Sequence, residues 1–197
     1  MAIGTVGPTK IKAGPGLIRY APIGTAIPTF TAAASKVTGT WTSWIDVGAT
    51  DEGLTYSEST DTEDIRVAES LYAVRTVTTG KTSTVSLSLA QVDDLNWKLV
   101  SNGGTITVTG TGATKLDVYV PPLAGSEQRI MLGYHSIDED EAIIWFACFN
   151  TGGFETARAN FADKHVLPAE FSVELPDPAV ATVPYKRWTS GALATAP

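Results

Sequence analysis

The chain is poor in the residues from which metal centres and covalent cross-links are built. Its 197 residues contain one cysteine, Cys148, and two histidines, His135 and His165. A single cysteine excludes an intrachain disulfide framework and a multi-cysteine zinc site, and it is compatible with assembly inside a cell. Because Cys148 lies within an apolar run, we interpret it as a small core residue and not as a reactive thiolate.

Long apolar runs and clusters of positive charge are also missing. The longest apolar run, 142–149, is far shorter than a membrane span, and residues 1–16 lack the basic and apolar segments of a secretory signal. We therefore expect no membrane insertion by this chain. Lys and Arg number 14 against 21 Asp and Glu, which gives a formal net charge of −7. This balance argues against tight binding to nucleic acid phosphates.

No catalytic motif is present. Gly80-Lys81-Thr82 has the last residues of a P-loop, but Arg75 stands where the first glycine is required, and no helix is predicted after Thr82. We interpret this segment as a hairpin tip. The two histidines have no serine or cysteine in a nucleophile context, so an enzyme is not expected.

One group of residues is a candidate for metal binding. His135 and the acidic run 138–141 could bind a divalent cation, but they lack the glycine spacing of a calcium loop. A solvated turn between two strands accounts for the same residues. We expect neither a metal nor a cofactor.

The residues that are abundant favour strands and turns. The chain has 18 Gly and 11 Pro, and its length suits one domain with a substantial core. The predicted strands are rich in β-branched and aromatic residues and are bounded by Gly, Pro or Asp: 43–47, 54–57, 71–79, 82–89, 129–136, 142–149 and 169–175. The first six form three predicted hairpins in chain order. The expected class is mainly β, a two-sheet antiparallel sandwich or barrel of about eight strands.

A single flanking helix is predicted at 90–101. Apolar residues between positions 89 and 99 recur at helical spacing. Ser88 and Gln91 have the spacing of a capping box, and Gly103 is placed to end the helix.

The polar segment 58–70 lies between two of the predicted hairpins. It is too polar for a core strand and long for an ordinary hairpin connection. We predict a loop with a function of its own.

The order of strand, acidic loop, hairpin and single helix, with the later segments 143–155 and 167–176, resembles the major tail tube protein of long-tailed (siphovirus-type) bacteriophages. The resemblance lies in the pattern of segments and includes no diagnostic short motif. It implies a tail-tube β-sandwich domain at 41–176, between an N-terminal arm at 1–40 and a C-terminal arm at 177–197. Proline is concentrated in both end segments, which suits extended arms. The long segment before Trp41 and an excursion at 105–126 depart from the family pattern.

The resemblance also implies a function. Members of the family form hexameric rings whose sheets join edge to edge, and the rings stack into a tube. Four strands per subunit would give a ring of about 24 strands and roughly 50 Å in backbone diameter, wide enough for a DNA duplex. A negatively charged lumen would conduct genomic DNA without binding it. The implied partners are a tape measure protein, a tail terminator and distal tail or baseplate proteins, with assembly in the host cytoplasm.

The resemblance assigns contacts to particular residues. The loop 58–70 would reach the adjacent ring through apolar anchors and polar contacts: Ile65 and Val67, then Asp61, Glu63, Asp64 and Arg66. Tyr185 and Trp188 are candidates for subunit contacts of the C-terminal arm, because disordered tails are poor in aromatic residues.

A function of another class stays open. A non-polymerising β-sandwich module of a virion or secreted protein would bind a glycan or receptor through exposed aromatic residues. The chain has five tryptophans, and we expect Trp41, Trp44 and Trp188 near the arms, where subunit contacts are the other interpretation. Polymerisation of the purified protein separates the two functions.

Overall fold

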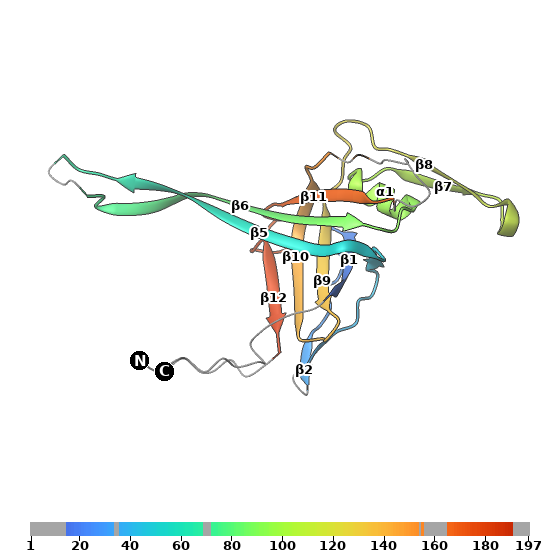
Figure 1. The fold of residues 1–197 in the computed structure, drawn as a ribbon, viewed down its shortest axis with the longest axis horizontal. Helices are drawn as coiled ribbons and strands as arrows, with labels where there is room; N and C mark the ends of the chain where they lie inside the picture. The colour runs from blue at the N-terminus through green and yellow to red at the C-terminus, as the bar shows by residue number, and fades with distance from the viewer. Residues whose placement is uncertain (1–14, 34–35, 69–71, 154, 156–164, 191–197) are drawn as a thin grey trace.

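The structure, a computed structural model, describes residues 15–33, 36–68, 72–153, 155 and 165–190. Most of its strands form one eight-stranded antiparallel sheet in the order β4-β1-β9-β10-β11-β6-β5, with β12 paired to β10 (Figure 1). The strands of this sheet are β1 Gly16–Pro22, β4 Ile45–Asp46, β5 Thr50–Ile65, β6 Arg75–Leu89, β9 Ile130–Ser136, β10 Glu141–Asn150, β11 Leu167–Val173 and β12 Tyr185–Thr189. Two further hairpins pair β2 (Thr31–Ala33) with β3 (Lys36–Thr38) and β7 (Thr105–Thr109) with β8 (Leu116–Val120).

Strand β10 divides the sheet into two layers. Its first half pairs with β12 and β9, whereas its last residues, from Cys148 to Asn150, pair with β11. The register shifts between Trp145 and Cys148, and an irregularity of this kind bends a strand. As a result β5, β6 and β11 cross over β1, β9, β10 and β12 (Figure 1). The predicted antiparallel, mainly β fold is confirmed, and the path of strands does not close into a barrel.

The main core lies between these layers. Alternate residues of β6 and β11 point into it, with Val85, Leu89 and Phe171 fully buried. From the opposite layer, Leu132 and Trp145 meet them. Transfer of such side chains from water stabilises the fold by about 1.5–3 kcal/mol each. The alternation that the sequence shows at 82–89 therefore identifies the buried face of β6 correctly.

A second, aromatic cluster covers the other face of β9 and β10. Phe30 lies 4.7 Å from Trp188 and 5.5 Å from Trp41, measured between ring centroids. Trp41 meets Trp44 edge to face at 5.0 Å. Gly133 of β9 leaves room for the Trp41 ring, because a Cβ there would lie 2.4 Å from that ring. Segments expected in the arms thus build part of the subunit interior.

The single helix of the described chain, α1, spans Asp94–Val100 and is shorter than the predicted 90–101. The capping box predicted at Ser88 and Gln91 is wrong, because Ser88 pairs with Pro168 in the β6–β11 ladder. The N-cap is Asp93, whose carboxylate accepts a hydrogen bond from the amide of Asn96 at 2.8 Å. No helix in the described part of the chain is long and apolar enough to cross a membrane.

Two of the predicted hairpins are wrong. The strand 43–47 pairs with β1 and not with 54–57, since Tyr20 stands opposite Ile45. Gly80 is not a hairpin tip. It lies inside the continuous strand β6, opposite Asp61, where the register shifts. The third predicted hairpin, β9 with β10, is confirmed.

Each of the two segments expected as arms contributes at least one strand to the fold. β1 lies between β4 and β9 in the sheet, inside the segment 1–40. Pro15 precedes β1 and Pro22 ends it, so the apolar residues between them pair without interruption. β12, inside 177–197, pairs with β10. Residues 1–14 and 191–197 lie outside the described residues.

Candidate assembly surfaces

A two-stranded hairpin projects from the body of the molecule (Figure 1). β5 pairs with β6 from Thr50 to Ile65, but β11 accompanies β6 only as far as Thr84. Beyond that point the eight paired residues 58–65 reach outward by about 27 Å, at about 3.4 Å per residue. The segment predicted as a loop at 58–70 is thus largely strand. Its threonines favour extended backbone although both faces are solvated, which is why it shows no hydrophobic alternation.

The base of the hairpin is fastened to the body by a polar cluster. Glu58 accepts hydrogen bonds from the Tyr56 hydroxyl at 2.8 Å and the Tyr185 hydroxyl at 3.4 Å. Lys81 donates to the same carboxylate at 3.3 Å. The Tyr56 hydrogen bond, followed by the one from Lys81, lowers the pKa of Glu58. The Tyr56 ring lies 5.6 Å from Trp145, so the base connects directly to the core.

The end of the hairpin carries exposed apolar side chains among acidic ones. The exposed fractions are 47% for Ile65, 45% for Val67, 84% for Tyr72 and 61% for Val74. Such a group in the described part of the tip is unusual for a solvated surface and is typical of an interaction site.

The predicted inter-ring residues lie in this hairpin. Asp61, Glu63, Asp64 and Ile65 belong to β5, and Arg66 and Val67 follow it. Asp64 accepts a hydrogen bond from Thr76 at 2.7 Å and lies 3.7 Å from Arg66. The six residues thus lie along the outer part of β5 and just after it. Their contact with another ring stays a prediction.

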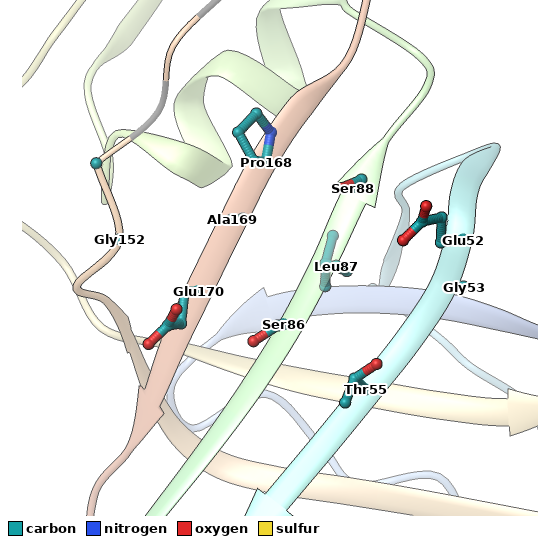
Figure 2. A pocket seen from close by; sticks show the side chains of 11 residues that line it. Glu52, Gly53, Thr55, Ser86, Leu87, Ser88, Gly152, Pro168, Ala169 and Glu170 are labelled. Atoms are coloured by element: carbon teal, nitrogen blue, oxygen red, sulfur yellow. The ribbon is translucent and has the colours of Figure 1, made fainter.

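The face of β5, β6 and β11 that points away from the core is polar. Thr55, Ser86, Ser88 and Glu170 share this face, and with Glu52 they line a shallow pocket of about 250 Å³ (Figure 2). The body of this face carries hydroxyl and carboxylate groups, and no Lys or Arg lines the pocket. Because side chains alternate along a strand, Asp61 and Glu63 lie on the same side of β5 as Thr55.

Both aromatic residues proposed for subunit contacts pack within their own subunit. The Tyr185 ring lies 5.6 Å from Tyr56, and Trp188 lies against Phe30. Each side chain is partly exposed. A further contact with a neighbouring subunit stays a prediction.

The tryptophans do not form an exposed aromatic platform. Trp44 and Trp145 are buried, and Trp41, Trp97 and Trp188 are half-buried. A stacking site for sugar rings needs exposed aromatic faces, so the glycan-binding interpretation loses its main support.

The group considered as a candidate for metal binding lies in and beside a hydrogen-bonded turn. His135 is buried, with its Nε2 2.8 Å from the carbonyl oxygen of Val37. Ser136 donates to Asp140 at 2.6 Å, and Glu139 pairs with Lys36 at 3.1 Å. No group of three metal-binding side chains occurs within the described residues.

Cys148 is expected to be unreactive in the folded protein. Its side chain is fully buried in the main core, and burial raises the pKa of the thiol. A thiol reagent such as dithionitrobenzoate at pH 8 should label no cysteine in native protein within an hour and one per chain in 6 M guanidinium. Rapid labelling without denaturant would contradict the burial of this residue.

Comparison with known proteins gives one family. A family model described as phage tail tube protein matches residues 8–148. No curated protein matches the chain.

Proposed function

The chain belongs to the phage tail tube protein family, and we propose that it forms hexameric rings that stack into a tube through which genomic DNA passes. Family membership supports a structural role in the virion tail. The proposal includes assembly in the host cytoplasm around a tape measure protein, with terminator and distal tail or baseplate proteins at the two ends.

One observation carries this proposal: the longest strand lies at the end of the sheet and extends into a free-standing hairpin. β5 has 16 residues and no second neighbour among the described strands. Long uncovered edges are sites of strand addition, and an isolated two-stranded hairpin is marginally stable in water. Pairing with strands of neighbouring copies would cover the edge of β5 and stabilise the hairpin. β5, β6, β11 and the end of β10 would give each subunit four strands in the ring wall.

We further propose that the polar face of β5, β6 and β11 lines the bore. Six subunits would repeat Glu52 and Glu170 around the wall, together with the acidic residue Asp61 of the hairpin. Hydroxyl groups and negative charges offer phosphates no attractive partner, so the DNA can slide.

This assignment of the bore predicts a gain of DNA binding. Glu52→Lys with Glu170→Lys should leave tubes of normal shape that retain duplex DNA at 50 mM salt and release it by about 200 mM, because phosphate contacts are strongly salt-dependent. Co-sedimentation of tubes with labelled DNA measures this. The matched variant, with glutamine at both positions, adds no positive charge and should bind as little DNA as the wild type. Equal binding by wild-type and lysine tubes would contradict the assignment.

The function itself is tested by negative-stain electron microscopy of the concentrated protein, with light scattering for its mass. Tubes or six-fold rings are expected. A protein that stays monomeric at high concentration, and that also fails to extend added tail tubes, would contradict the proposal.

A further inference from the structure

A small apolar notch opens between α1 and the ends of β1 and β9. Its volume is about 120 Å³. Apolar atoms dominate the walls, which are formed by Tyr20, Pro22, Ile45, Leu95, Leu99 and Ile130. A cavity of about 150 Å³ holds a benzene molecule, so the notch has room for one branched aliphatic side chain.

The charged residues that line the notch are both basic. Lys98 projects from the last turn of α1, and Arg129 precedes β9. Arg129 pairs with Glu174 and lies 5.2 Å from the centre of the Phe149 ring, which holds its guanidinium group in place. Glu174 is the acidic partner of Arg129, and Lys98 adds a second positive charge.

The notch is complementary to the hairpin tip. The tip presents aliphatic side chains, Ile65 at the end of β5 and Val67 just after it. The charged residues around them are Glu63, Asp64, Arg66 and Arg75. The apolar anchor matches the apolar notch in polarity. In charge, Asp64 pairs with Arg66 and Arg75 faces Ile65, so Glu63, on the same side of β5 as Ile65, is the acidic residue that matches the basic rim. This complementarity rests on described residues alone.

We propose that the notch receives the hairpin tip of a second copy of this chain, with Ile65 and Val67 against Leu95 and Glu63 beside Lys98. The proposal rests on the proposed tube and names the surface of the neighbouring subunit that the hairpin binds.

The placement of the two surfaces excludes a contact within one subunit. The tip lies at one extreme of the molecule, and α1 lies at the other side of the body (Figure 1). The hairpin tip and the notch are different surfaces on opposite sides of one subunit. A contact between them is therefore a heterologous interface, which propagates from copy to copy. Such an interface suits rings that stack in one direction.

Charge reversal tests the contact. Lys98→Glu and Glu63→Lys should each raise the protein concentration needed for tube formation at least tenfold, because each places like charges together. The double variant should return it to within about threefold of the wild type. Thermal melts confirm that each variant is folded. Lys36→Glu, a reversal outside the notch, should form tubes normally.

Cysteine cross-linking gives a second measurement. Buried Cys148 does not compete, so Val67→Cys with Leu95→Cys should yield a ladder of covalent multimers on a non-reducing gel once tubes are oxidised. Val67→Cys with Val118→Cys, a surface position of β8, should yield none.

The outcomes separate the two proposals. Failure of the wild type to assemble would overturn the proposed function. Normal tubes from Lys98→Glu, failure of the double variant to recover, or equal ladders from both cysteine pairs would overturn the notch while leaving the tube intact. Recovery together with a ladder from the Leu95 pair alone supports the notch.

Discussion

Removal of the projecting part of the β5/β6 hairpin is expected to abolish tube formation and leave a folded monomer. The variant replaces residues 60–81 with Asn-Gly, so that Ser59 and Thr82, which face each other in the ladder, flank a two-residue turn. A deletion of residues 60–68 alone would leave part of β6 without its partner strand. Shortening both strands avoids that fault.

The monomer should stay folded because the removed residues lie outside the core. Residues 60–68 are all exposed, and the main core begins at Tyr56 and Val85. Among the described residues, no member of either hydrophobic cluster lies in the removed segment 60–81, so the shortened monomer should keep its core. Circular dichroism measures whether the monomer is folded, and electron microscopy measures whether tubes form.

A control in the paired strands of the hairpin shows whether tube formation depends on the length and tip of the hairpin or on its local sequence. Thr62→Ala with Thr78→Ala changes one facing pair of the ladder and keeps the hairpin at full length. We expect normal tubes from this variant. Tubes from the shortened variant would contradict the role assigned to the hairpin.

Asn150→Ala is expected to cause a large loss of stability. The buried Asn150 side chain donates to the carbonyl oxygen of Val100 and accepts from the amide of Glu170 at 3.0 Å. It thereby ties the end of α1 to β11. The buried Val100 carbonyl left without a partner costs about 1–3 kcal/mol, and the lost, part-buried hydrogen bond to the Glu170 amide adds about 1 kcal/mol, so the free energy of unfolding should fall by about 2–4 kcal/mol. Urea unfolding followed by tryptophan fluorescence measures this change.

Asn102 and Asn150 form one hydrogen-bond network, and two substitutions of Asn102 separate the effect of its hydrogen bonds from that of backbone strain. The Asn102 side chain donates to the carbonyl oxygen of Asn150 at 2.8 Å and accepts from its amide at 2.7 Å. Its backbone φ is 55°, in the left-handed region. Asn102→Gly removes the hydrogen bonds without strain, whereas Asn102→Ala adds about 1 kcal/mol of strain. A loss below 0.5 kcal/mol in Asn150→Ala would show that the network contributes little.

Local sequence patterns are sufficient to predict a strand and its core-facing side where one face of that strand is buried. The alternation of Val85, Leu87 and Leu89 with polar residues predicts β6 and its core face. The apolar run of β10 and the turn after Ser136 predict the β9/β10 hairpin. The sequence indicates the candidate hairpin residues for a different reason: the segment is polar and long, and the order of elements resembles a known family.

Local patterns failed where the partner of a segment is distant in sequence. The acidic stretch after Ser57 is a strand because Arg75–Leu89 pairs with it, and both of its faces are solvated. Gly80 resembles a turn residue, but it occupies an irregular position inside a strand. The notch joins residues from β1, β4, α1 and β9, so no window of sequence contains it.

The sequence by itself determined the mainly β class, the acidic charge and the presence of a helix after β6, because each depends on composition or on residues within a few positions of one another. Only the tertiary structure decided that β1 lies inside the sheet, that the polar segment is a projecting hairpin, and that Asn102 and Asn150 join the helix to the sheet. The physical reason is that ladder pairing and buried hydrogen bonds depend on which distant segments meet. Which segments meet depends on the free energy of packing the whole core.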